Sequence, residues 1–77
     1  MLTTGNQLRA ARALVAMDQT TLAKAAGVNK NTIVAMEKRG AEVLTSGLDT
    51  IQAVMRALEA AGIEFLNHGQ PGVRLRA

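Results

Sequence analysis

The stretch Gln19–Gly40, QTTLAKAAGVNKNTIVAMEKRG, holds two short helical patterns on either side of a single glycine. Asp18 is a good N-cap for a helix over residues 19–26. The inward side of that helix is predicted to be Leu22, Ala23 and Ala26. Gly27 then ends the helix, because glycine readily adopts the left-handed conformation that other residues avoid. We therefore expect the next helix to follow a tight turn and to cross the first sharply.

The second helix of this pair is predicted over residues 30–38, with Asn29 as its N-cap. Ile33 and Met36 are spaced to lie on the inward side of the helix, and Val28 is expected to fill the angle between the two helices. Two short helices joined by a glycine turn are the arrangement that inserts one helix into the major groove of a DNA duplex.

Ahead of this pair, a first helix is expected from about residue 5 to residue 16, with Thr4 as its cap. Its apolar residues recur at spacings of three and four, and they are Leu8, Ala11, Leu14 and Val15.

After the pair, residues 41–47 are predicted to form a loop, and Thr45 or Ser46 to cap a fourth helix that ends at about Ala61. The apolar face of this helix is expected to contain Leu48, Ile51, Val54, Met55 and Leu58. Residues 63–66 and 73–76 then read as two short strands around a turn. The chain is therefore predicted to be mainly α, with four helices and a short C-terminal β-hairpin.

The composition fits one small domain, with residues 1–62 as its helical part and residues 63–77 as a hairpin tail of the same domain. The 77 residues include no cysteine and one histidine, His68, which we expect in an exposed turn. Since such a chain offers neither a metal-ligand set nor an acid–base–nucleophile group, we expect no metal, no cofactor and no enzymatic activity. It shows no signal or membrane segment, so we expect a soluble cytoplasmic protein without a small-molecule ligand.

Positive charge is concentrated in the first half of the chain. Residues 1–40 hold six basic and two acidic side chains, a net charge of +4, whereas residues 41–77 hold three basic and four acidic ones, a net charge of −1. A basic half favours a polyanionic partner such as nucleic acid, although an ordinary solvated surface would have the same charge.

Six positions of the helix pair carry a specific pattern, namely Gln19, Leu22, Ala23, Gly27, Ile33 and Glu37. With this spacing the chain strongly resembles the helix-turn-helix of the Cro/lambda-repressor-like (XRE) family of transcriptional regulators, over about residues 5–61. Met17 departs from the family, where a tryptophan is frequent, and we expect it to alter packing only. The resemblance implies a four-helix lambda-repressor-like DNA-binding domain.

The resemblance and the chemistry of the side chains together assign two kinds of DNA contact. Contacts to base edges, which select the sequence, are expected from Lys30, Asn31, Thr32, Val34 and Ala35. Contacts to phosphates, which position the protein, are expected from Arg12, Gln19, Asn29, Lys38 and Arg39. Thr32 could reach a base or a phosphate. Asn29 is a helix cap first and a DNA contact second.

Arg12 and Glu37 resemble the family's ion pair between the first and third helices. Such a pair would aim the guanidinium at a phosphate, or it is purely structural. One module of this size buries only about 600–1,000 Å² on DNA, so a homodimer is expected. For its interface we favour the hairpin, paired edge to edge with a partner chain, with Ile63, Phe65, Val73 and Leu75 on its apolar side. The alternative is that this side packs on the chain's own fourth helix.

Two classes of function follow from this sequence. The first is a sequence-specific regulator of transcription, a repressor that binds a palindromic operator on double-stranded DNA as a homodimer, with an activator as its variant. The second is a protein-interaction module, an antiactivator or antitoxin, built on a helix-turn-helix scaffold. Polar and basic residues such as Lys30 and Asn31 favour the first class, whereas the apolar Val34 and Ala35 are compatible with the second.

Overall fold

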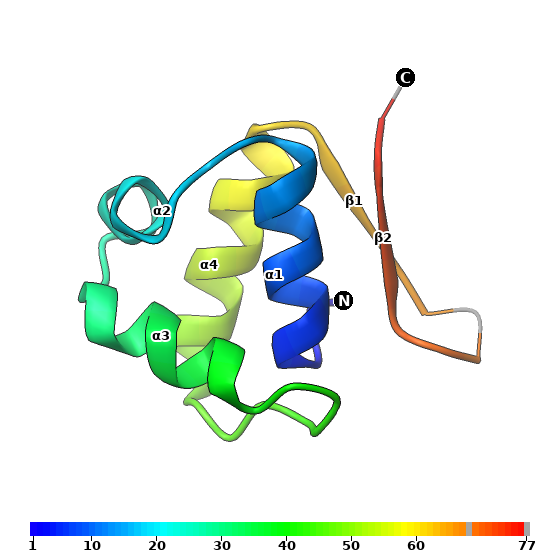
Figure 1. The fold of residues 1–77 in the computed structure, drawn as a ribbon, viewed down its shortest axis with the longest axis horizontal. Coiled ribbons are helices and arrows are strands. Elements are labelled where there is room, and N and C mark those ends of the chain that lie inside the picture. Colours follow the sequence, from blue (N-terminus) through cyan, green and yellow to red (C-terminus); the bar gives the residue numbers. More distant parts are fainter. Residues whose placement is uncertain (68, 77) are drawn as a thin grey trace.

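Four helices and a two-stranded hairpin follow one another along the chain in the computed structural model, which describes residues 1–67 and 69–76 (Figure 1). The helices are α1 (Gly5–Leu14), α2 (Gln19–Ala26), α3 (Lys30–Lys38) and α4 (Leu48–Ala60). The strands are β1 (Ile63–Leu66) and β2 (Gly72–Leu75). The prediction of a mainly α chain with a C-terminal hairpin is confirmed. None of the described helices has the length and apolar character that a membrane crossing requires.

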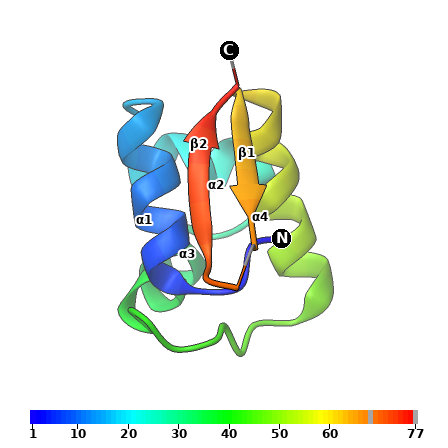
Figure 2. The same cartoon turned by 90° about the vertical axis from the view of Figure 1, so that its right-hand side faces the viewer.

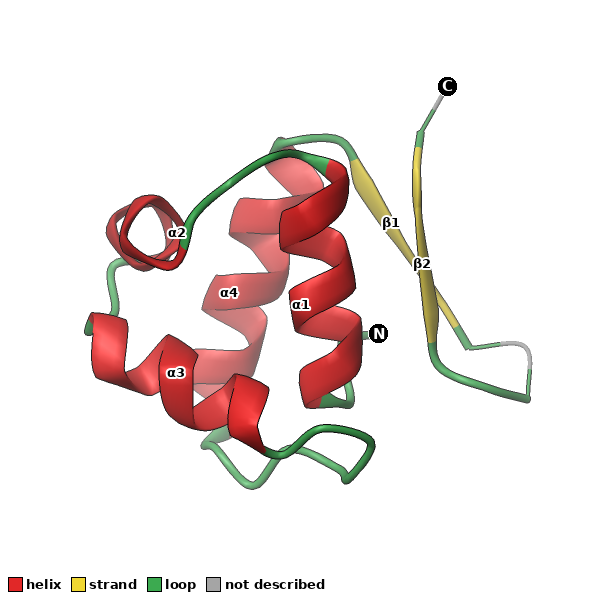
Figure 3. Ribbon diagram, in the orientation of Figure 1, coloured by secondary structure: helices red, strands yellow, loops and turns green. Residues whose placement is uncertain are grey.

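The elements form two sides around the central helices α1 and α4 (Figures 1 and 2). The helices α2 and α3 lie on one side of α1 and α4, and the hairpin lies on the other. In Figure 3 the two strands likewise lie together on one side of the helices. In Figure 2 the strand β2 runs in front of and beside α1, whereas β1 lies nearer to α4. The hairpin and the helix-turn-helix therefore occupy opposite sides of the molecule.

One apolar core joins all of these elements. Its buried members are Leu2, Leu8, Ala11, Leu22, Ala23, Ile33, Met36, Leu44, Val54, Leu58 and Ile63. All of these residues except Ile63 belong to residues 1–62, and Ile63 belongs to strand β1. Because Ile63 is only 1% exposed, the tail is part of the core of the helical domain rather than an appendage.

The N-terminal ends of the first three helices are capped as the sequence predicts. The Thr4 hydroxyl accepts a hydrogen bond from the Gln7 amide at 3.2 Å, and the Gln7 side chain accepts one in return from the Thr4 amide. The Asp18 carboxylate accepts from the Thr21 amide at 2.7 Å, and the Asn29 side chain accepts from the Asn31 amide at 2.8 Å. These side chains satisfy amide groups that the helices cannot pair internally.

The fourth helix begins differently from the prediction. Its N-cap is Gly47, and no side chain makes a capping hydrogen bond there. The prediction that Thr45 or Ser46 caps this helix is therefore wrong, because the helix begins one residue later than a Ser46 cap requires and two residues later than a Thr45 cap requires. Leu48, predicted to face inward, is 59% exposed because it lies at the first position of the helix, whereas Val54 and Leu58 further along are buried.

The first helix is shorter than predicted. It ends at Leu14, with Val15 as its C-cap, and Ala16 has a positive φ of 53°, so the chain leaves the helical conformation there. Leu14 is 43% exposed although the sequence spacing predicts it to face inward, whereas Val15 and Met17 pack against the core.

The hairpin is antiparallel, and its register pairs Ile63 with Leu75 and Phe65 with Val73. The second strand begins and ends one residue earlier than predicted. Ile63, Phe65 and Val73 pack on the core of their own chain, with β2 against α1 and β1 against α4. The alternative expectation, packing on the chain's own helices, therefore holds for these three residues, whereas Leu75 is 49% exposed. Edge-to-edge pairing of the hairpin with a partner chain stays a prediction. The expectation for His68 lies outside the described residues.

Candidate nucleic-acid interface

The turn between α2 and α3 sets the angle between the two helices. Gly27 has φ 71° and ψ 31°, the left-handed conformation expected of a glycine that ends a helix. The next amide, of Val28, donates to the Ala23 carbonyl at 2.9 Å, and the Val28 side chain packs against the core. Figure 1 shows α2 end-on and α3 lengthwise, so the two helices cross steeply. The sharp crossing predicted from the glycine is confirmed.

One side of α3 faces solvent. Ile33 and Met36 are at most 1% exposed and fix the inner side of the helix. The exposed residues are Lys30, Asn31, Ala35 and Lys38, and we call this set the outer face of α3. Thr32 and Val34 flank it and are half-buried. Of the residues predicted to contact bases, Lys30, Asn31 and Ala35 thus present their side chains to solvent on one helix, with Thr32 and Val34 at its margins.

A hydrogen-bonded ion pair ties α3 to α1. Arg12 donates from Nε and Nη2 to the two carboxylate oxygens of Glu37, at 2.6 and 2.9 Å, and from Nη1 to the Met17 carbonyl at 3.0 Å. Glu37 is buried, and its bond to Arg12 raises the guanidinium pKa above its ordinary value. Gln19, from the start of α2, donates to the same carboxylate at 3.1 Å. Three helices therefore meet at Glu37, and both proposed roles of Arg12 are compatible with this geometry.

The backbones of α1 and α3 also touch directly. The Asn6 amide donates to the Gly40 carbonyl at 2.8 Å, so the beginning of α1 meets the end of α3. A Cβ on Gly5 would lie 2.5 Å from the Met36 oxygen and 2.9 Å from the Glu37 oxygen. Only glycine permits so close an approach. The position of α3 is therefore determined by backbone contact as well as by the ion pair.

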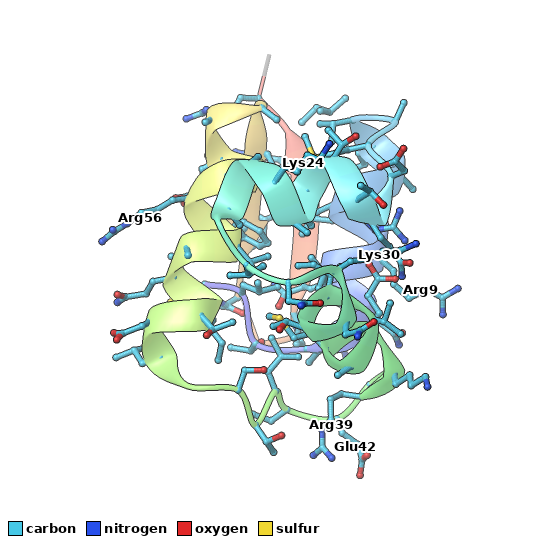
Figure 4. The ribbon with its side chains drawn as sticks, turned by 90° about the vertical axis from the view of Figure 1, so that its left-hand side faces the viewer. Arg9, Lys24, Lys30, Arg39, Glu42 and Arg56 are labelled. Carbon is cyan, nitrogen blue, oxygen red and sulfur yellow. The ribbon has the colours of Figure 1, made fainter. Side chains whose placement is uncertain are left out.

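An open groove of about 520 Å³ lies where α1, α3 and the start of α2 come together. It is lined by Arg9, Arg12, Asp18, Gln19, Val34, Glu37 and Lys38. Arg9 was absent from the residues that the sequence predicts as contacts. Figure 4 shows that it projects on the same side of the molecule as Lys30. Its position three residues before Arg12 on α1 is the signal that could have identified it.

The start of α2 has a negative charge in this groove. Asp18 is fully exposed, and hydrogen bonds from Thr21 lower the pKa of its carboxylate. It is therefore ionised at neutral pH. Beside it, Gln19 already donates one amide hydrogen to Glu37. A phosphate at the start of α2, as predicted from the sequence, would have to approach this carboxylate.

The remaining basic side chains near α3 differ in their surroundings. Arg39 turns into the following loop, where its Nε donates to the Val43 carbonyl at 3.2 Å and its Nη1 lies 3.8 Å from Glu42 (Figure 4). Arg56, on α4, projects from the opposite edge of the view from Arg9. Within the described residues, neither Lys30 nor Lys38 makes an ion pair. The ammonium groups of the two lysines of α3 can thus bind an anion, whereas the Arg39 guanidinium already contacts the loop.

A comparison of the chain with protein-family models and with curated protein sequences found no match.

Proposed function

We propose that this chain is a sequence-specific DNA-binding regulator of transcription of the Cro/lambda-repressor-like (XRE) type. The outer face of α3 is the observation that carries the proposal. This face presents Lys30, Asn31 and Lys38 to solvent on a helix whose opposite side is buried and whose end is held by α1. A rigidly held helix with polar and basic side chains on its free side suits the major groove of B-DNA.

The side chains at the start of α3 have the chemistry of base readers. A lysine can donate to O6 or N7 of guanine, and an asparagine can pair with adenine through two hydrogen bonds. Lys30 and Asn31 therefore act as the principal readers, and the methyl group of Ala35 contacts a thymine methyl. Each good bidentate pair discriminates against a wrong base by about 1–3 kcal/mol.

The functional unit that we propose is a homodimer on a palindromic operator. Two copies would set their α3 helices about 34 Å apart, one turn of DNA, and double the small area that one module buries. Of the predicted interface residues, Ile63, Phe65 and Val73 pack within the chain, and Leu75 is the most exposed, at 49%. Bound across a promoter, such a dimer excludes the polymerase, so we propose repression in the cytoplasm as its mode of action.

The experiment that tests this function is selection from a pool of random duplexes at two salt concentrations, followed by sequencing of the bound fraction. A palindromic motif is expected for the native chain, and its loss is expected when Lys30→Ala and Asn31→Ala are combined. Arg56→Ala is the matched control, because it removes an exposed basic side chain on another side of the molecule. This control variant is expected to retain the motif.

A second candidate function is a protein-interaction module on the same scaffold. The apolar pair Val34 and Ala35 in the middle of α3 favours it, because neither side chain can form a hydrogen bond with a base edge. In this case the duplex pool yields only weak, salt-sensitive binding without a motif, and the variant of Lys30 and Asn31 binds like the native chain.

A further inference from the structure

The groove between α1, α3 and the start of α2 is lined by two basic side chains that lie far apart in the sequence. Arg9 comes from α1 and Lys38 from the end of α3, so that they reach the groove from different helices. Both are exposed, and within the described residues neither makes an ion pair. Two unneutralised cations at one open groove favour an anion between them.

The base of this groove is already neutralised. Arg12 and Glu37 form the bidentate ion pair described above, and Gln19 adds a hydrogen bond to the same carboxylate. The opposite charges of this pair offset each other, so the pair gives the groove little net charge. Arg12 therefore holds α1 against α3, the two helices that carry Arg9 and Lys38, which is a positioning role.

The third wall of the groove repels anions. Asp18 lines it with an exposed carboxylate that also caps α2. An anion in the groove is therefore expected to lie toward Arg9 and Lys38 and away from the start of α2. This asymmetry differs from the arrangement expected from the sequence, in which Gln19 and the free amides of α2 hold the phosphate.

We propose that the groove is a binding site for a single phosphate of duplex DNA, held jointly by Arg9 and Lys38, with Asp18 limiting its affinity. The inference rests on the proposed function, because the outer face of α3 brings duplex DNA to this side of the molecule. Arg9 thereby becomes a DNA contact, and α1 takes part in setting the register of α3 along the groove of the DNA.

The first test measures the salt dependence of binding to a duplex of about 20 base pairs by fluorescence anisotropy, between about 0.05 and 0.2 M salt. The logarithmic slope per neutralised phosphate is about 0.9, so the loss of one phosphate lowers affinity about eightfold at about 0.1 M salt. If Arg9 and Lys38 share one phosphate, the double variant Arg9→Ala with Lys38→Ala loses about one such increment of slope. Two increments would mean two separate phosphates and would overturn the shared site.

The second test uses Asp18→Asn, which keeps a good helix cap but removes the negative charge. It is expected to tighten binding to any duplex several-fold, and the gain is expected to disappear when Arg9 and Lys38 are also replaced. Arg56→Ala is again the control, with an unchanged gain from Asp18→Asn. Unfolding curves verify that all variants are folded, as expected for exposed side chains.

The outcomes separate this proposal from the function on which it rests. If Lys30→Ala with Asn31→Ala abolishes the motif while Arg9→Ala leaves both slope and affinity unchanged, the phosphate site is wrong and the regulator remains. If the native chain binds no duplex, both are wrong. If Asp18→Asn weakens binding to a folded protein, the carboxylate does not oppose the phosphate and the proposal is overturned.

Discussion

The two sides of α1 are joined to the rest of the molecule by different kinds of contact. Toward α3, the contacts are directional: a backbone approach at Gly5, an amide bond to Gly40 and the bidentate pair of Arg12 and Glu37. Toward the hairpin, a single side-chain hydrogen bond, from Gln7 Nε2 to the Gly72 carbonyl at 3.0 Å, accompanies apolar packing of Val73 on the common core. Directional contacts determine an angle, whereas apolar contacts mainly contribute free energy of unfolding.

The same contrast applies to the two hydrogen-bonded ion pairs among the described residues. Arg12 and Glu37 are 21% and 7% exposed and connect separate helices, whereas Arg74 and Glu64 are 63% and 37% exposed and connect adjacent strands. Exposed pairs contribute little to stability, while breaking a buried pair leaves an uncompensated charge. We therefore expect changes on the α3 side to alter DNA recognition, and changes on the hairpin side to alter stability alone.

The largest effect is expected for Gly5→Ala. Its new Cβ would lie 2.5, 2.8 and 2.9 Å from three backbone atoms of residues 36, 40 and 37, none of which can rotate away. The helix α1 must move away from α3, at a cost of more than about 3 kcal/mol in the free energy of unfolding. Chemical denaturation measures this cost. Gly47→Ala is the matched control, because nothing lies within 4 Å of its Cβ, and a comparable loss there would refute the steric explanation.

On the hairpin side, Ile63→Ala is expected to lower the free energy of unfolding by about 3 kcal/mol, since the side chain is 1% exposed and leaves a cavity. Its cross-strand neighbour Leu75 is 49% exposed, so Leu75→Ala should cost only about 1 kcal/mol. The remaining folded protein should bind its DNA motif with unchanged affinity. If folded Ile63→Ala lost its sequence preference, the hairpin side would affect DNA recognition as well as stability, and the contrast between the two sides would be wrong.

Glu37→Gln tests the directional contacts without changing the shape of the side chain. We expect a loss of about 2 kcal/mol in stability, because Arg12 keeps its charge but loses its anionic partner. The ratio of specific to random duplex binding should fall, since α3 loses its alignment while the protein gains a positive charge. Glu64→Gln, in the exposed hairpin pair, should cost less than about 1 kcal/mol and leave that ratio unchanged. Equal effects of the two substitutions would contradict the comparison.

The parts of the fold that sequence could predict are those determined by neighbouring residues. Asp18, Gly27 and Asn29 act within a few residues of themselves, and all three behave as predicted. The surface against which the hairpin packs could not be predicted, because alternating apolar residues fit a partner chain and the chain's own helices equally well. The groove also depends on the fold, since Arg9 and Lys38 are 29 positions apart in the sequence and lie on different helices. Exposure of Leu48 likewise depends on where its helix begins.

The smallest effect expected is a pH dependence at the start of α2. Hydrogen bonds from Thr21 lower the pKa of Asp18 in the folded state, so its ionised form contributes stability that is fully present above the unfolded pKa of about 3.8. This contribution is lost as the pH falls through the lower folded pKa. Asp18→Asn should remove it, because the amide caps the helix at every pH. Between about pH 2 and 6, the free energy of unfolding should therefore change less with pH in the variant than in the native chain, as measured by denaturation curves at each pH. If the two profiles coincide, the cap at Asp18 does not depend on its charge, and the carboxylate in the groove would then act only on the DNA.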